Sequence, residues 1–327
     1  MAGIMNKTIN IAEIIQRKGI VTQFQPIISV RQKALDYSLR PGNIIIKIVE
    51  SEAKNLSALT QFVQNYKNLG CLIALDDFGA GYSNLDRVAV IRPDIIKIDR
   101  LLIQDINQEY YKQEIVKSLV GLAHKLGALA LAEGVENEKE ALVTLELGAD
   151  MLQGYYFSKP VSISEVCIER YQSLIDRIGT DFRTALVQKR REQKVQRGKL
   201  NIMVNGFTAA LSETNESDFD EKILEFLNSH SSLECIYVLD EWGLQISDTI
   251  YDPTKFSEEK RTIFSPARKG ADQSLKEYYW MIDADMKVII TEPYISMASG
   301  NRCVTISALF NNIQDNKYIL CLDVQAS

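Results

Sequence analysis

The sequence predicts an α/β fold of parallel strands, followed by a long helix and a smaller α+β region. Apolar runs of strand length alternate with amphipathic helical segments across the first 160 residues, separated by short glycine-marked joints. Acidic or amide side chains stand at the ends of several of these runs, which is where α/β barrels carry their chemistry. The alternation stops after Pro160, and strand-like sequence returns after residue 200. We therefore expect a domain of parallel β/α architecture, a connecting helix and a second domain.

Composition narrows the class of protein. The chain has 327 residues, is 46% hydrophobic and carries a net charge of −6, which suits a folded two-domain protein and argues against a general nucleic-acid binder. No apolar run approaches the length of about 18 residues that a membrane span needs, and the first ten residues lack a signal core. We expect a cytoplasmic protein that does not bind a membrane. The cysteines stand singly, which argues against a disulfide framework or a zinc site: Cys71, Cys167, Cys235, Cys303 and Cys321.

The stretch from Cys71 to Asp99 is central to the first region. An apolar strand ends in Asp76 and Asp77, a glycine-rich turn leads into a helix, and the next strand carries Lys97 at its centre. Two adjacent carboxylates repel one another, so a divalent cation between them is one interpretation. The alternative is an aspartate pair that caps the next helix. A lysine inside an apolar strand requires an anionic partner, so we expect Lys97 to lie against a carboxylate.

The other elements of this region follow the same alternation. We expect strands over residues 21–28, 43–51, 71–77, 95–98 and 128–133, with a short strand that ends at Gln153, and helices over residues 9–18, 52–70, 83–90, 109–125 and 138–147. The polar residues at these strand ends are predicted to converge at one rim: Asp76, Asp77, Asp99, Glu133 and Gln153.

After Pro160 the sequence predicts a long amphipathic helix, since Tyr171, Leu174, Ile178 and Phe182 recur at spacings of three and four. Its end is basic, and a solvated helix face explains this better than nucleic-acid or membrane binding. A helix of this kind between two domains is also a plausible dimer contact, so we expect a homodimer. The predicted boundaries are residues 1–162, 163–200 and 201–327.

Residues 201–327 are expected to form an antiparallel sheet with helices at one side. The sequence predicts a helix over residues 218–228, two strands around the turn at Trp242, and further strands over residues 278–282, 287–296, 302–311 and 318–324. This order fits a PAS-like or Cache-like sensor, and the segment 291–310 resembles the tyrosine-bearing strand and hairpin of Cache-type domains. A pocket for an unidentified small ligand is one interpretation of its aromatic and basic residues, and ordinary core packing is the other: Trp242, Tyr279, Trp280, Tyr294 and Arg302.

Five motifs of the first region resemble, in order, those of the EAL domain family of cyclic di-GMP phosphodiesterases: FQPII, DDFGAGYSNL, PDIIKIDR, AEGVEN and QGYYFSKP. The resemblance covers residues 22–160 and implies a modified TIM barrel that binds cyclic di-GMP at the carboxyl ends of its strands. It also implies that Mg²⁺ or Mn²⁺ activates a water molecule, which opens one phosphodiester and gives linear pGpG.

The resemblance assigns the chemistry to residues of the central rim. Asp76 and Asp77 would hold metal, and Lys97 would orient or polarise the attacking water. Glu133 would act as base or metal ligand, and Gln153 would support the water. Hard oxygen ligands suit Mg²⁺, and cations across the attacking and leaving oxygens favour phosphodiester hydrolysis.

Three further residues take supporting roles by the same resemblance. Gln25 would contact the phosphate of the substrate, and Asp99 would also bind substrate. Glu50 would stabilise the loop that follows the aspartate pair. The family has a metal-binding glutamate three residues before the position of Glu50, and this chain has Lys47 there. A protonated amine cannot ligate Mg²⁺, so we expect Lys47 to lie against the aspartates as an internal counter-ion.

The chain also departs from the family in length. The Glu-Ala-Leu signature and the asparagine-bearing strand after it are absent, and only residues 29–43 separate the first two predicted strands. Two βα units of about 30 residues each do not fit there. Either the sequence lacks a stretch of the natural chain, which we favour, or a partner fills the gap. We therefore expect a protein of phosphodiesterase lineage with weak or no hydrolysis; the alternative is an inactive regulator that binds cyclic di-GMP or a protein.

Overall fold

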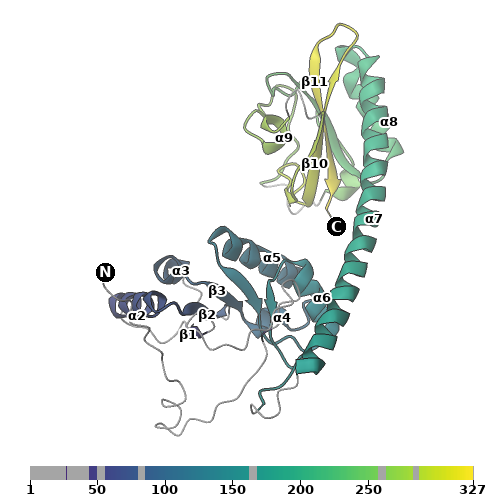
Figure 1. Ribbon diagram of the computed structural model, residues 1–327. Helices are drawn as coiled ribbons and strands as arrows, with labels where there is room; N and C mark the ends of the chain where they lie inside the picture. The colour runs from purple at the N-terminus through teal and green to yellow at the C-terminus, as the bar shows by residue number, and fades with distance from the viewer. Residues whose placement is uncertain are drawn as a thin grey trace, which may run out of the picture. The chain divides into compact units, whose positions relative to one another are not determined.

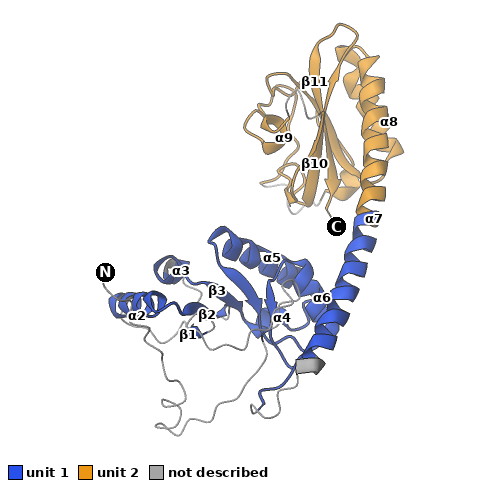
Figure 2. Cartoon of the chain, viewed as in Figure 1, with its two compact units in different colours: residues 1–191 blue, residues 192–327 orange. Residues whose placement is uncertain are grey.

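The computed structural model describes residues 27, 44–49, 56–79, 85–161, 168–256, 263–282 and 287–326. The chain divides into two compact units, residues 1–191 (unit 1) and residues 192–327 (unit 2) (Figure 2). Each unit has its own hydrophobic core.

Among the described residues of unit 1, five strands form a parallel sheet in the order of the sequence (Figure 1). The strands are β1 (Ile45–Val49), β2 (Leu72–Phe78), β3 (Ile95–Ile98), β4 (Leu129–Ala132) and β5 (Met151–Leu152). The helices between them are α2 (Leu56–Asn68), α3 (Leu85–Ile91), α4 (Arg100–Ile103), α5 (Tyr110–Lys125) and α6 (Glu138–Glu146). The alternation of strand and helix predicted from the sequence is confirmed here. The strand expected over residues 21–28, apart from Ile27, and the helix expected over 9–18 lie outside the described residues.

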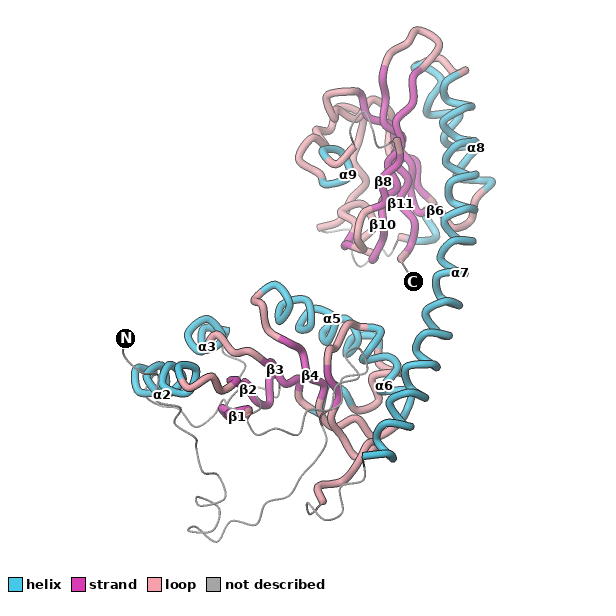
Figure 3. Tube along the Cα trace, viewed as in Figure 1, coloured by secondary structure: helices cyan, strands magenta, loops and turns pink. Residues whose placement is uncertain are grey.

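The two faces of this sheet have different environments because side chains of a strand alternate between them. On one face, Ile73, Leu75 and Ile96 share a core with apolar residues of α2, α3 and α5. Figure 3 traces these helices and the strands of the sheet. On the other face, Ala74, Ile95 and Leu131 form a smaller apolar cluster. The second face also carries the polar residues that follow this cluster toward the carboxyl ends of the strands.

A register shift in the pairing of β2 with β3 determines the positions of Asp76 and Asp77. Leu75 pairs with Ile96 and Phe78 pairs with Ile98, so Asp76 and Asp77 together lie opposite one residue of β3. This is the arrangement of a β-bulge, which redirects a side chain and interrupts the regular alternation. Asp77 has a φ of 54°, in the left-handed region that non-glycine residues seldom adopt. The bulge therefore gives adjacent carboxylates access to the same side of the sheet.

A long helix, α7 (Ile168–Ser212), contributes to the cores of both units. Ile175 and Ile178 belong to the core of unit 1, while Val204 and Phe207 belong to the core of unit 2. Every residue from 188 to 199 between these parts is exposed. The helix predicted over residues 163–200 continues to Ser212, because its last turns have the sheet of unit 2 to pack against.

The described strands of unit 2 form an antiparallel sheet in the order β7-β6-β11-β10-β8, with β9 paired to β10. The strands are β6 (Leu233–Asp240), β7 (Ile250–Tyr251), β8 (Val288–Ile290), β9 (Tyr294–Ile295), β10 (Arg302–Asn311) and β11 (Lys317–Gln325). Helix α8 (Phe219–Ser229) and the end of α7 cover one face. The other face packs against the segment that contains the short helix α9 (Glu277–Trp280).

Two local predictions in unit 2 were wrong. Residues 278–282 were expected as a strand, but residues 277–280 form α9, in which Tyr279 and Trp280 donate backbone hydrogen bonds to Lys276. A short apolar run satisfies both helical and strand periodicities, and local hydrogen bonds decide between them here. The second strand expected after Trp242 is reduced to two isolated bridges, Leu239 with Gln245 and Leu244 with Asp272.

A third segment, residues 287–296, was expected as one strand and forms two. Strands β8 and β9 flank Pro293, which has no N–H group to donate to a continuous ladder. The helix expected over residues 218–228 and the strands expected over residues 302–311 and 318–324 are confirmed as α8, β10 and β11.

Candidate active site

The polar face of the sheet in unit 1 carries a continuous chain of ion pairs. The Lys97 ammonium lies 2.5 Å from Asp76 Oδ1 and also pairs with Glu133. The Lys47 ammonium lies 2.7 Å from Asp76 Oδ2. We call these four residues, in the order Lys47, Asp76, Lys97 and Glu133, the ion-pair chain. Both contacts expected from the sequence are present: Lys97 has anionic partners, and Lys47 lies against the aspartate pair.

Adjacent strands hold the ion-pair chain in place. Lys47 comes from β1, Asp76 from β2 and Lys97 from β3, while Glu133 directly follows β4. Lys97 and Asp76 are 3% and 5% exposed, so their mutual attraction is little screened by water, whereas Lys47 has an exposed side chain. Since a buried charge without a partner is costly, these contacts account for a lysine at the centre of an apolar strand.

Burial and the charges within the ion-pair chain shift the pKa values of its side chains. Burial alone raises the pKa of Asp76, but the hydrogen bonds from Lys47 and Lys97 outweigh burial and hold this pKa below its usual value. Burial lowers the pKa of Lys47, but Asp76 and Glu133 outweigh it and raise this pKa overall. Burial raises the pKa of Glu133 more than Lys97 lowers it. Glu133 therefore retains a proton to a higher pH than an exposed glutamate does.

Asp77 completes a cluster of three carboxylates with Asp76 and Glu133. One oxygen atom from each of the three lies within 4.8 Å of the others. Burial and the nearby charges of Asp76 and Asp99 raise the pKa of Asp77. The cluster has the oxygen ligands that a divalent cation requires. However, both oxygens of Asp76 already accept bonds from ammonium groups, which repel a cation and occupy its coordination positions.

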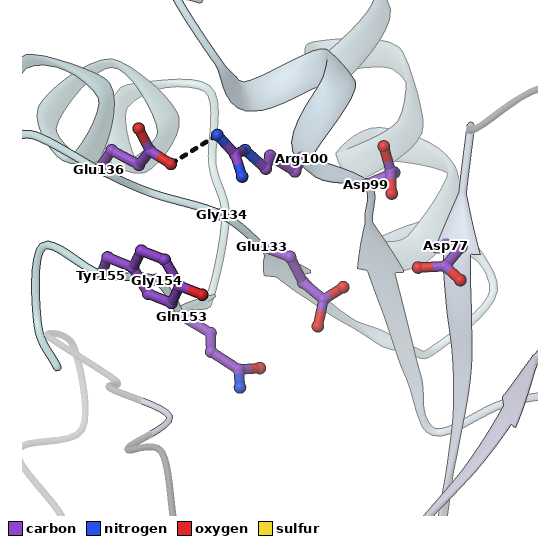
Figure 4. A pocket seen from close by; sticks show the side chains of 9 residues that line it. All are labelled: Asp77, Asp99, Arg100, Glu133, Gly134, Glu136, Gln153, Gly154 and Tyr155. Carbon is purple, nitrogen blue, oxygen red and sulfur yellow. Dashed lines mark ion pairs between the residues drawn. The ribbon is translucent and has the colours of Figure 1, made fainter. Parts of the chain in front are cut away.

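A cavity of about 290 Å³ opens beside these residues and receives three of the acidic side chains named above, Asp77, Asp99 and Glu133 (Figure 4). Gln153, predicted from the sequence as a site residue, lines the same cavity. A second cavity of about 200 Å³ lies on the same face of the sheet as Ala74, Ile95 and Leu131, and it is lined by Lys47, Lys97 and Gln153, among others. The structure therefore brings Asp77, Asp99, Glu133 and Gln153 to one cavity, and Asp76 lies in the ion-pair chain.

Three residues at the larger cavity were not predicted from the sequence: Arg100, Glu136 and Tyr155. The guanidinium of Arg100 pairs with Glu136 at 2.7 Å, and the side chains of both line the rim (Figure 4). Each residue directly follows or belongs to a motif that the sequence analysis singled out, so their positions in PDIIKIDR, AEGVEN and QGYYFSKP were the available signal.

Two glycines keep the rim segments close together. A side chain at Gly134 would overlap Arg100, and Gly134 has a φ of +70°. A side chain at Gly154 would overlap the backbone of Val135. Val135 donates a backbone hydrogen bond to Gln153, so the segments that follow β4 and β5 touch at this point. These close approaches fix Glu133 relative to Gln153.

Three further residues were predicted from the sequence: Asp99, Gln25 and Glu50. Asp99 accepts a hydrogen bond of 2.8 Å from the Leu101 backbone and caps α4, in addition to lining the cavity. Gln25 and Glu50 lie outside the described residues. In the part of the chain that the structure describes, no helix combines the length and apolar character that a membrane crossing requires.

Comparison with known proteins identifies relatives of the first region. The EAL domain family model matches residues 32–160. The cyclic di-GMP phosphodiesterase RocR of Pseudomonas aeruginosa is 35% identical over 129 residues, which are 38% of this chain and 32% of RocR. The cyclic di-GMP phosphodiesterase PdeF of Escherichia coli is 36% identical over 134 residues, which are 41% of this chain and 18% of PdeF. The chain therefore spans less than two thirds of the length of these curated relatives.

A further relative extends over both units. The EAL-domain containing protein YkuI of Bacillus subtilis is 26% identical over 242 residues, 72% of this chain and 57% of YkuI. Its crystal structure, in complex with cyclic di-GMP and calcium, matches with a TM-score of 0.71 and 22% identity, covering 88% of this chain and 71% of that one. This match shows a shared fold. Residues 32–160 of this chain belong to the EAL domain family.

Proposed function

We propose that unit 1 binds cyclic di-GMP at the cavity beside the ion-pair chain and hydrolyses it weakly or not at all. The names of RocR and PdeF, and the ligand in the YkuI structure, support the choice of ligand. The larger cavity, about 290 Å³, is shaped by the same motifs that carry the family resemblance. A dinucleotide extends beyond a space of this size, so part of it would lie over the open rim.

The observation that carries this proposal is the position of Lys47. Its ammonium holds one oxygen of Asp76 while Lys97 holds the other, so the two charges of this aspartate and Glu133 are balanced within the protein. A divalent cation with Asp76 as ligand does not fit this arrangement. Hydrolysis of a phosphodiester near neutral pH depends on a cation to activate water, so turnover is expected to be low.

The same residues can still recognise a phosphodiester. In this proposal Lys97 polarises or positions a group at the phosphate, Glu133 acts as a base, and Gln153 orients a water molecule. Asp99 contributes to substrate binding, as does Gln25, and Glu50 stabilises the loop after Asp77. An ammonium has three donor hydrogens, so the exposed ammonium of Lys47 can bond to a phosphate oxygen as well as to Asp76.

An active phosphodiesterase is the second candidate function. It is favoured by the oxygen atoms of Asp76, Asp77 and Glu133 that lie within 4.8 Å of one another. Calcium accompanies cyclic di-GMP in the YkuI structure, so a divalent ion such as Mg²⁺ or Mn²⁺ is the cofactor to test. In that case, the ion would have to displace Lys47 from Asp76.

Titration calorimetry and a turnover assay separate the two candidates. We expect cyclic di-GMP to bind the full chain with equal affinity in Mg²⁺ and in EDTA, and we expect little conversion to pGpG in Mn²⁺. An active relative assayed in parallel serves as the control. Ordinary turnover in Mn²⁺ would favour the second candidate, and the absence of binding in both conditions would exclude cyclic di-GMP as the ligand.

Unit 2 is proposed to regulate unit 1 as a PAS-like or Cache-like sensor with a small ligand of its own. Its antiparallel sheet, with helices on one face and irregular segments on the other, supports this. We further propose a cytoplasmic homodimer with domains at residues 1–162 and 201–327 and a connecting helix between them. The two βα units missing from the sequence are proposed to exist in the natural chain, which the intact mass of the natural protein would test.

A further inference from the structure

A tight turn at residues 154–157 connects the larger cavity of unit 1 with helix α7. Tyr155 lines the cavity, and more than half of its surface is exposed (Figure 4). Phe157, two residues later, is buried in the same core as Ile175 of α7. The backbone N–H of Phe157 donates a hydrogen bond of 3.1 Å to the carbonyl of Gly154, which closes the turn. The residues of this turn are therefore held together between the cavity and α7.

Tyr156 links the turn to α6 and α7. Its hydroxyl oxygen accepts a hydrogen bond of 2.8 Å from Arg177 Nη2, and the hydroxyl group donates one of 3.3 Å to Glu138 Oε2. Arg177 Nη2 and Glu138 Oε2 are themselves 3.6 Å apart. We call Glu138, Tyr156 and Arg177 the Tyr156 triad. The backbone N–H of Tyr156 donates to the carbonyl of Val135 at 3.0 Å, so this residue contacts the segment after β4 as well.

A second ion pair between α6 and α7 provides a comparison for the triad. Lys189 pairs with Glu146, and these side chains are about as exposed as those of Arg177 and Glu138. An exposed ion pair contributes less than about 1 kcal/mol to stability, so neither pair is needed for folding. Lys189 and Glu146 do not line the cavity and lie outside the turn. The two pairs therefore differ in what they contact, and only the triad includes a residue of the turn.

We propose that Arg177 is a positioning residue for the ligand site of unit 1. Through its bond to Tyr156, it holds the turn that presents Tyr155 to the cavity. The inference rests on the proposed binding of cyclic di-GMP at this cavity. Arg177 lies outside residues 32–160, which the EAL family model matches, so the family resemblance assigns it no role.

The effect of the triad works in both directions, because the coupling between a binding site and a conformational equilibrium is reciprocal. A ligand that contacts Tyr155 stabilises the docking of α7 on the rest of unit 1, and local opening of α7 weakens ligand binding. Helix α7 also contributes Val204 and Phe207 to the core of unit 2. The triad thus gives the proposed regulation of unit 1 a physical route.

Titration calorimetry of the full chain with cyclic di-GMP tests the positioning role. We expect Arg177→Met and Tyr156→Phe each to weaken binding by about fivefold. The double variant should lose no more than either single variant, because both changes remove the same contact. Arg177→Lys retains a charged donor and should recover part of the affinity. Lys189→Met is the matched control and should bind as the wild type does.

Hydrogen exchange gives a second readout that a merely structural contact would not change. In the wild type, saturating cyclic di-GMP should slow amide exchange in residues 171–182 of α7, since the bound ligand opposes local opening. In Tyr156→Phe, equally saturated with ligand, this protection should be smaller. Equal protection in the two proteins would contradict the coupling.

The calorimetric outcomes separate this inference from the proposed function. Equal affinity in the wild type, Arg177→Met and Tyr156→Phe would overturn the inference alone. An equal loss in Lys189→Met, or additive losses in the double variant, would also overturn it, because a general loosening of α7 would then explain the effect. If the wild type binds no cyclic di-GMP, the proposed function and this inference both fail. Circular dichroism checks that each variant is folded.

Discussion

At the scale of the residue, Lys47 has the largest consequence for chemistry. Its ammonium and that of Lys97 hold the two oxygens of Asp76. A carboxylate in place of Lys47 would remove one of these positive charges and add an oxygen ligand to the cluster formed with Asp77 and Glu133. Among the described residues, Lys47 is thus the side chain that most directly opposes a cation at this cluster.

We therefore expect Lys47→Glu to raise Mn²⁺-dependent hydrolysis of cyclic di-GMP by at least about tenfold. The matched control is Lys47→Gln, which removes the ammonium without adding a charged ligand and should raise hydrolysis little. Conversion to pGpG, followed by chromatography, measures both. Equal rates for the two variants would mean that a new ligand at this position is not what limits turnover.

Lys97 is expected to matter for stability as well as for binding. Lys97→Met leaves the buried Asp76 with only the exposed Lys47 as partner, and breaking a buried ion pair of this kind costs about 3 kcal/mol. Lys189→Met is the control, since its pair with Glu146 is half-exposed and should contribute less than about 1 kcal/mol. Urea unfolding followed by circular dichroism gives both values. A similar loss in the two variants would contradict the importance of burial.

The contacts of Lys97 were predictable from the sequence because an amine within an apolar strand has to be neutralised. The left-handed backbone conformation of Asp77 was not predictable from the sequence. Two adjacent aspartates at the end of a strand give the same sequence pattern whether or not the second has a positive φ. The bulge depends on how β2 pairs with β3, and that register is a tertiary property. Arg100 and Glu136 were missed for a similar reason: their contact joins the start of α4 to the segment after β4, which is distant in sequence.

At the scale of the element, the glycines of the rim set the spacing of the loops. Gly154→Ala places a methyl group against the backbone of Val135 and is expected to destabilise the protein by about 2 kcal/mol. Gly121→Ala, in the interior of α5 with nothing within 4 Å of the new methyl group, should instead stabilise it by up to about 1 kcal/mol. Thermal unfolding of the two variants measures the difference. Equal melting temperatures would contradict the close approach.

Elements with long, regular patterns were predicted best. Helix α5 was expected over residues 109–125 and is found at Tyr110–Lys125, because several turns of amphipathic sequence and tertiary packing favour the same structure. The four residues of α9 were misread as a strand, since so short a run has no periodicity to distinguish the two. The length of a segment therefore affected the accuracy of its predicted secondary structure more than its composition did.

At the scale of the whole molecule, the two units are expected to be separable by proteolysis. Residues 188–199 of α7 are exposed throughout and contain six trypsin sites, at Lys189, Arg190, Arg191, Lys194, Arg197 and Lys199. An exposed helical stretch with little tertiary packing is marginally stable and opens locally. Limited trypsin digestion followed by mass spectrometry should therefore accumulate two fragments that end within this stretch. Rapid loss of the full chain without such fragments would contradict this expectation.

Both tryptophans of the chain, Trp242 and Trp280, belong to unit 2, and both are largely exposed. Their emission therefore reports on the carboxyl-terminal half alone, while far-ultraviolet dichroism reports on the helices and strands of both halves. A denaturation experiment that records the two signals together can assign each transition to its own unit. The unmodified protein thus carries an intrinsic optical label for the half that we propose to be its sensor.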